Sequence, residues 1–166
     1  MALAEQLPVE AFLKERHVRF ELAPHTGVFT AKSEARALGL PAHCVLKVVV
    51  LRTDEDFAIA VVPASRKLDM NLLSHVVTGS HVRLATEDEI AVRYPGFELG
   101  AIPPLPDLLG VRAYVDPRIF DPNEVAFADG RQTESMISSP QELFWGEDVF
   151  VAPISREPDV EGMWAV

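Results

Sequence analysis

One lysine interrupts an otherwise apolar stretch of the sequence. Residues 45–51 read Val-Leu-Lys-Val-Val-Val-Leu, with Lys47 in third place. At the alternation of a β-strand both faces of this segment are apolar, so we expect both to be buried and Lys47 to point into the interior or into a cleft. Because a buried ammonium must be paired or must have a shifted pKa, Lys47 is predicted to anchor an anionic or carbonyl-bearing ligand. The alternative is a lysine at the mouth of the strand, with a packed stem and its ammonium in water.

Other familiar catalytic signatures are missing. The sequence contains no GxGxxG, Walker, HExxH or GxSxG motif. Cys44, the single cysteine, has no identifiable base partner, so a small buried apolar residue is favoured over a nucleophile. The histidines lack metal-ligand spacing, and surface or structural roles are favoured for all five: His17, His25, His43, His75 and His81. We therefore expect neither a metal site nor a cofactor.

Hydrophobic periodicity and capping signals predict the elements around Lys47. Thr30 is expected to cap a helix over 31–38 that ends at Gly39 and leads into the lysine strand. A polar turn at 53–56 joins that strand to a second apolar strand at 57–62, which predicts a hairpin. Further helices are predicted over 8–18, over 68–77, from Thr86 and from Ser139, and further strands over 20–22, 81–84, 111–115, 125–127, 135–137 and 148–152.

The segment from Tyr94 to Gly110 breaks this pattern. It contains Gly96 and Gly100 and several prolines, and these residues favour a shaped loop over any regular element. The loop is long for a simple connector.

Strands and helices without a regular βαβ alternation predict an α+β (mixed α/β) fold with a curved, mostly antiparallel sheet and flanking helices. A chain of 166 residues that is 48% hydrophobic fits one domain spanning residues 1–166. We recognise no membrane segment or secretion signal, and expect a cytoplasmic protein. The formal net charge of −10 argues against an extended basic platform for nucleic acid, so any such contact must be local.

Several short motifs occur in a characteristic order along most of the chain. Ala-Arg-Ala-Leu-Gly at 35–39 precedes the lysine strand, which is followed by Leu68-Asp69, Gly96, Gly-Ala-Ile-Pro-Pro at 100–104, Val115-Asp116, Gly130 and Pro-Gln-Glu-Leu at 140–143. This order, from about Phe20 to Leu143, resembles that of the YbaK/prolyl-tRNA synthetase-associated editing domain family.

The resemblance implies a free-standing aminoacyl-tRNA deacylase, which hydrolyses the ester between a wrong amino acid and the tRNA 3′ end. It implies that Lys47 holds the terminal adenosine or its phosphate and that the loop at 100–104 lines the aminoacyl pocket. The implied catalytic residues are Lys47, Gly100 and Asp116, and the implied substrate-binding residues are Phe29, Thr30, Gly96, Ala101, Ile102, Pro103, Pro104 and Gly130. The implied partner is the acceptor end of a mischarged tRNA, with an aminoacyl-tRNA synthetase or elongation factor supplying further affinity, and neither DNA nor a membrane.

Such chemistry needs no nucleophilic side chain. Glycine lets main-chain N–H groups approach a carbonyl oxygen closely, and these fixed dipoles stabilise the oxyanion that forms when water attacks an ester. One methylene group discriminates between substrates by only about 10- to 200-fold, which gives a separate editing step a physical motive.

Two departures from the family pattern leave the edited amino acid open. Glu134 ends the segment Gly130-Arg-Gln-Thr-Glu134, where synthetase-embedded members have Gly-x-x-x-His, and Pro106 stands where many relatives have glycine. Two alternative functions also stay open. One is a non-catalytic module that binds a nucleotide or aminoacyl analogue in the Lys47 cleft, and the other is a hydrolase of another acyl ester.

Overall fold

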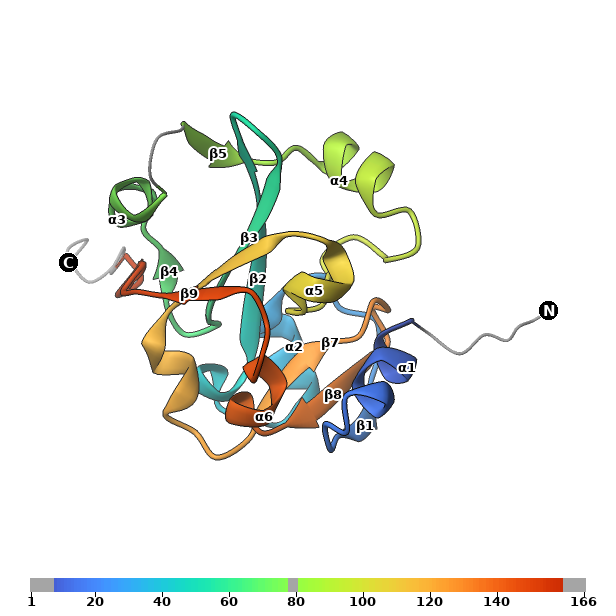
Figure 1. The fold of residues 1–166 in the computed structure, drawn as a ribbon. Coiled ribbons are helices and arrows are strands. Elements are labelled where there is room, and N and C mark those ends of the chain that lie inside the picture. The colour runs from blue at the N-terminus through green and yellow to red at the C-terminus, as the bar shows by residue number, and fades with distance from the viewer. Residues whose placement is uncertain (1–7, 78–80, 160–166) are drawn as a thin grey trace.

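The computed structural model describes residues 8–77 and 81–159. Within these ranges a five-stranded sheet, a three-stranded sheet and a two-stranded ribbon are surrounded by short helices (Figure 1). The helices are Pro8–Glu15 (α1), Ala31–Leu38 (α2), Met70–Val76 (α3), Glu87–Arg93 (α4), Pro106–Leu109 (α5) and Pro140–Phe144 (α6), with 3-10 turns at Ala42–Cys44 (η1) and Pro117–Phe120 (η2).

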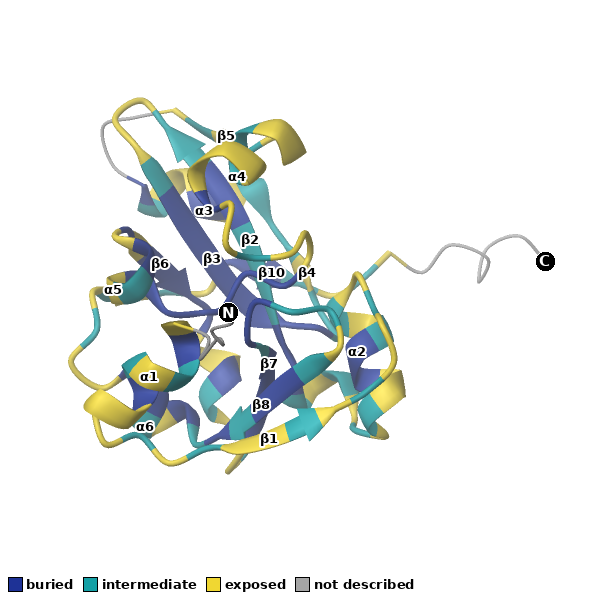
Figure 2. Ribbon diagram, turned by 90° about the vertical axis from the view of Figure 1, so that its right-hand side faces the viewer, coloured by how far each residue is buried: buried dark blue, intermediate teal, exposed yellow. Residues whose placement is uncertain are grey.

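The five-stranded sheet has the order β5-β2-β3-β6-β9. Its strands are Leu46–Thr53 (β2), Phe57–Pro63 (β3), Val82–Leu84 (β5), Arg112–Val115 (β6) and Val149–Val151 (β9). β2 pairs antiparallel with β3 and β5, whereas β6 pairs parallel with β3 and β9. β3 is therefore the centre of the sheet, and Figure 2 shows it buried along most of its length.

The three-stranded sheet is antiparallel, in the order β1-β8-β7. Its strands are Glu21–Pro24 (β1), Val125–Ala128 (β7) and Glu134–Ser138 (β8), and the two-stranded ribbon pairs Lys67–Leu68 (β4) with Ser155–Arg156 (β10). A single parallel bridge between Val45 and Ala126 joins the start of β2 to β7. The two larger sheets are thus held side by side at this bridge.

The main core lies between the two larger sheets. Leu46, Val50 and Ile59 from the five-stranded sheet pack there against Phe127 and Met136 from the three-stranded sheet. Helices α1, α5 and α6 add buried residues to the same cluster. On the other face of β2 and β3, Leu51 and its neighbours pack against α3.

The α+β class and the mostly antiparallel pairing that the sequence predicts are confirmed, and so are the helix caps. The Thr30 side chain accepts a hydrogen bond from Ser33 N–H, Gly39 ends α2 at φ 70°, and Thr86 forms a capping box with Glu89. The sheet joins the predicted hairpin of β2 and β3 to two parallel pairs made by β6, which local sequence patterns do not specify.

Two expectations need correction. The sequence predicts a loop throughout 94–110, but Pro106 begins helix α5, because Leu109 is buried in the core and Gly110 closes the helix at φ 72°.

The sequence also predicts that both faces of the lysine strand are buried. Residues 47–49 are instead half-buried, because β5 covers the edge of β2 only over residues 51–53.

No helix in the described residues is long and apolar enough to cross a bilayer.

Asp116 secures the end of β6. Its side chain is fully buried and accepts hydrogen bonds from Arg118 N–H, Ile154 N–H and the Ser155 hydroxyl. Burial acts to raise its pKa, but these hydrogen bonds and the Arg118 charge outweigh burial, and its pKa is lowered. The carboxylate therefore joins β6 and η2 to the segment that leads into β10.

Asp116→Asn is expected to lower the free energy of unfolding by about 2–4 kcal/mol at neutral pH, because an amide cannot accept at both former oxygen positions. A lowered native pKa gives stability that is present above the unfolded-state pKa of about 3.9 and is lost as the pH falls through the native value. The deficit, measured by chemical denaturation, should therefore shrink in acid. Asp121→Asn, at an exposed position nearby, is the control, and an equal loss in both variants would contradict this role.

Candidate functional site

A cleft of about 590 Å³ lies along the edge of β2 that β5 leaves uncovered. Its walls come from β2, from the residues that begin α2, from the loop around Gly100 and from α4 with the residues before it. The lining residues are Phe29, Thr30, Ala31, Glu34, Leu46, Lys47, Val48, Val49, Val50, Leu84, Ala85, Glu87, Ile90, Leu99, Gly100, Ile102 and Ala128. Its volume lies within the usual range for small-molecule sites.

The main chain of β2 faces this cleft. Val45 C=O accepts from Ala64 N–H on the β3 side, and Val50 C=O accepts from Ala85 N–H on the β5 side. Because backbone groups alternate between the two edges of an antiparallel strand, Val48 directs its N–H and C=O to the same side as Val50. β5 does not extend as far as Val48, so these groups are directed toward the cleft.

Lys47 combines a half-buried position with a positive neighbourhood. Its Nζ donates to Arg66 C=O at 3.0 Å, which uses one of the three donors of the ammonium. Burial lowers its pKa, and the charges of Lys32 and Lys67 lower it further. The charged side chains that act on Lys47 are thus both cations, so an anion would be stabilised beside it.

Gly100 fits closely against the chain that precedes α2. It adopts φ +77°, and a Cβ at this position would clash with the Phe29 carbonyl oxygen. Phe29 itself is 66% exposed and lines the cleft directly before Thr30, the N-cap of α2. Glycine is therefore required here both by conformation and by the close approach of two backbones.

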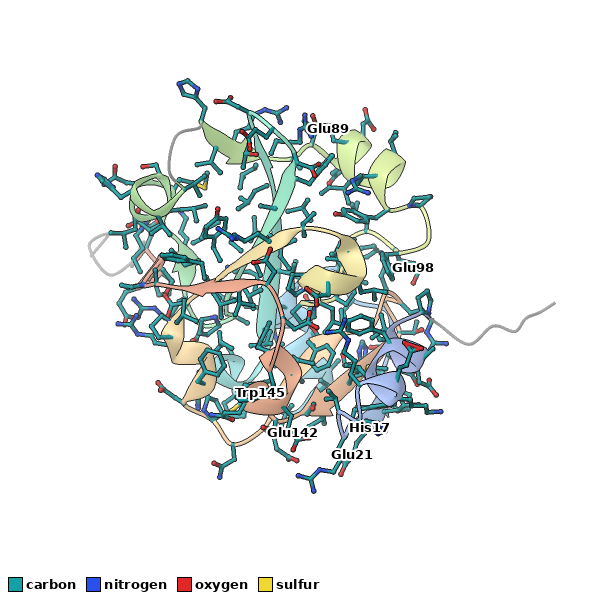
Figure 3. All side chains as sticks on the ribbon, in the orientation of Figure 1. His17, Glu21, Glu89, Glu98, Glu142 and Trp145 are labelled. Atoms are coloured by element: carbon teal, nitrogen blue, oxygen red, sulfur yellow. The ribbon has the colours of Figure 1, made fainter. Side chains whose placement is uncertain are left out.

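The loop after β7 supports the Gly100 loop. Gly130 adopts φ +106°, and a Cβ there would lie 2.6 Å from the Phe97 ring. Gly130 C=O accepts from Glu98 N–H at 2.8 Å, and the Glu98 carboxylate accepts from Gln132 N–H at 2.7 Å. Figure 3 labels Glu98 in the loop that follows α4. Gly130 thus contributes to the site by fixing the loop that carries Gly100.

A buried polar cluster behind α2 has no counterpart among the predicted site residues. Glu34 is 5% exposed, lines the cleft and accepts from the Ser135 hydroxyl. His25 Nε2 lies 2.9 Å from the same hydroxyl, and His25 Nδ1 lies 2.7 Å from Thr26 C=O. Sequence reasoning missed Glu34 because it follows the N-cap by four residues within a polar helix. The one available signal was its position on the face that includes Ala31 and Ala35.

The predicted site residues fall into three groups. Phe29, Thr30, Lys47, Gly100 and Ile102 line the cleft together. Ala101 lines a small adjoining pocket with Gly100 and Glu34, and its N–H donates to Glu98 C=O. The other predicted residues do not line the cleft. Gly96 is exposed, whereas Pro103, Pro104 and Gly130 are buried within their loops. Asp116 is buried directly after β6.

A second hollow of about 680 Å³ lies at one end of the five-stranded sheet, where the turn between β2 and β3 approaches Arg16, Asp107 and Arg112. Its cations are already paired, Arg16 with Asp107 and Glu147 and Arg112 with Asp148. Compared with the β2 cleft, it has less unpaired positive charge to offer an anionic ligand.

Comparisons with known proteins identify the family of this chain. The family model described as the aminoacyl-tRNA editing domain matches residues 25–144, a range that includes every predicted site residue. A proline–tRNA ligase of Halalkalibacterium halodurans is 29% identical over 87 residues, which make up 52% of this chain and 15% of that protein. The chain thus matches a small part of the ligase.

Solved structures share the fold. A hypothetical protein, APE2540, superposes with a TM-score of 0.80 at 24% identity, over 89% of this chain and 99% of that one. A candidate trans-editing enzyme for prolyl tRNA synthetase superposes with a TM-score of 0.75, also at 24% identity, over 92% of this chain and 99% of that one. Since the family model covers well over half of the 166 residues, this chain belongs to the aminoacyl-tRNA editing domain family.

Proposed function

We propose that the protein is a trans-editing aminoacyl-tRNA deacylase that hydrolyses the ester of a mischarged tRNA in the β2 cleft. The observation that carries the proposal is one shared cleft, which combines the half-buried Lys47 with main chain at Val48 and Gly100. Membership of the editing family and the likeness to a candidate trans-editing enzyme support it. A tRNA substrate also favours a cytoplasmic location.

In this proposal Lys47 binds the phosphate or ribose of the terminal adenosine, and the acyl group extends toward Gly100. Water attacks the ester carbonyl, the carbonyl oxygen becomes an oxyanion, and the ribose oxygen leaves with a proton. Main-chain N–H groups at Gly100 and Val48 are the donors we assign to the oxyanion. Ala101 N–H is already bonded to Glu98 C=O, so it has no part in this assignment.

The cleft selects by size. Apolar side chains of Val48, Val50 and Ile102 line it. Phe29 and Leu99 also line it, and both are exposed to solvent. Such walls accept small side chains and exclude large ones by steric overlap. Asp116 and Gly130 enter the proposal only as residues that hold the surrounding loops.

A panel of mischarged tRNAs tests the function directly. The proposal expects hydrolysis of at least one of them to free amino acid and intact tRNA. A binding module would retain adenosine-containing ligands without hydrolysing any of them, and a general acyl esterase would hydrolyse small esters equally well without tRNA. Either result would contradict the deacylase.

Lys47→Ala is expected to lower kcat/KM for deacylation by about 100-fold or more, mainly through KM, because a half-buried cation facing an anion is removed. Steady-state deacylation over a range of substrate concentrations measures kcat and KM. Lys14→Ala is the matched control, since Lys14 pairs with Glu10 on α1, outside the cleft. Unchanged turnover in Lys47→Ala would remove Lys47 from the mechanism.

Gly100→Ala is expected to reduce deacylation by about tenfold or more, because a Cβ displaces the Phe29 backbone. Gly39→Ala is the control, because Gly39 has φ +70° and nothing within 4 Å of the new Cβ. Both variants should lose about 1 kcal/mol of stability to the positive φ, which thermal unfolding measures. Equal activity in the two would show that the close approach at Gly100 is not needed.

Association with tRNA should depend only weakly on salt. A chain of net charge −10 with a local group of lysines at the cleft is expected to make about two or three phosphate contacts. Fluorescence anisotropy with labelled tRNA at several salt concentrations gives the slope. A steep slope, equivalent to about six or more contacts, would contradict recognition confined to the acceptor end.

A further inference from the structure

The Glu34 cluster contains a proton whose position the hydrogen bonds constrain. Thr26 C=O can only accept, so His25 Nδ1 must carry a hydrogen. The Ser135 hydroxyl has one hydrogen but contacts both Glu34 and His25 Nε2. The second contact therefore needs a hydrogen from a protonated Glu34 or from a protonated His25. Glu34 and His25 together therefore hold one proton more than an ionised Glu34 beside a neutral His25 would hold.

This proton can change sides without leaving the cluster. When Glu34 gives its proton to Ser135, Ser135 gives its own to His25, and the products are a carboxylate and an imidazolium. Burial raises the Glu34 pKa, the Ser135 hydrogen bond and the His25 charge lower it, and the Asp129 charge raises it. Asp129 is itself paired with Arg131, which also contacts Glu134. A cation bound in the cleft would stabilise the Glu34 carboxylate and so favour the form of the cluster with a carboxylate and an imidazolium.

The cleft consequently presents a cation from one element and an ionisable carboxyl group from another. Lys47 on β2 is influenced by Lys32 and Lys67, whereas Glu34 on α2 is influenced by His25 and Asp129. Neither of these two neighbours of Glu34, His25 or Asp129, is a permanent cation. An aminoacylated 3′ end has the matching pattern, because its phosphate is negative and the α-amino group of its ester is positive.

We propose that Glu34 binds the α-ammonium group of the aminoacyl ester, and that Ser135 and His25 are positioning residues that take up its carboxyl proton. This inference rests on the proposed function for its choice of substrate class. It assigns the cleft to esters of amino acids with a free α-amino group, as opposed to acyl esters in general.

Binding of two stable analogues tests the proposal without hydrolysis. Both are acceptor-stem RNAs that end in 3′-amino-3′-deoxyadenosine, joined by an amide either to alanine or to propionate, which lacks the ammonium. Wild type is expected to bind the alanyl analogue about tenfold or more tightly in calorimetric titrations. Glu34→Gln should lose this preference while binding the propionyl analogue as before, and Glu34→Asp should retain part of it. Glu124→Gln, at an exposed position before β7, is the control.

The pH dependence separates binding from a merely structural role. The preference should decline as the pH falls, starting above the range of an ordinary glutamate, because the pKa of Glu34 is raised. Ser135→Ala removes a hydrogen bond that lowers this pKa, so the decline should begin at a higher pH. A structural role would weaken both analogues equally and leave their ratio independent of pH.

Each other outcome is decisive. A preference that survives in Glu34→Gln, or no preference in wild type, would overturn the Glu34 assignment and leave the deacylase proposal standing. A preference that depends on Glu34 in a protein that hydrolyses no mischarged tRNA would support the inference and contradict the deacylase. Binding of neither analogue would overturn both.

Discussion

The incomplete cover of β2 is the constraint on which the rest of the site depends. β5 pairs with residues 51–53 and then leaves the strand, while β3 stays paired along its whole length. Main-chain groups at Val48 are consequently directed away from β3 in the middle of an apolar strand. A long uncovered strand edge usually invites aggregation, but here α2, the Gly100 loop and the residues before α4 surround it. The edge becomes the floor of a cleft.

Two glycines allow that enclosure. Gly100 brings its loop against the Phe29 carbonyl, and Gly130 brings a second loop against the Phe97 ring. Hydrogen bonds from Glu98 and Gln132 then join the two loops. The result is a wall of the cleft that Lys47 also lines, built from loops joined to each other before any substrate binds. Preorganised dipoles of this kind stabilise developing charge without reorganisation.

The sequence predicted the local elements well and the assembly of the site in part. Thr30, Gly39 and the Thr86 capping box are local signals, and the structure has the helices they predict. Lys47 was identifiable because a charge within an apolar strand has few structural explanations. Asp116 shares a motif with the site but lies at the end of β6, since its partners Ile154 and Ser155 come from a distant segment. Glu34 escaped notice within a polar helix, and its partner Ser135 lies 101 residues away in the sequence.

The central claim is that the 3′ end of an aminoacylated tRNA lies along the open edge of β2. Residue-resolved NMR of the protein with an uncleavable aminoacylated acceptor stem tests it most directly. The account predicts the largest amide shift changes, and new protection from hydrogen exchange, at Val48 and Gly100. Changes concentrated around Arg16 and Arg112, in the hollow beside the turn between β2 and β3, would contradict it.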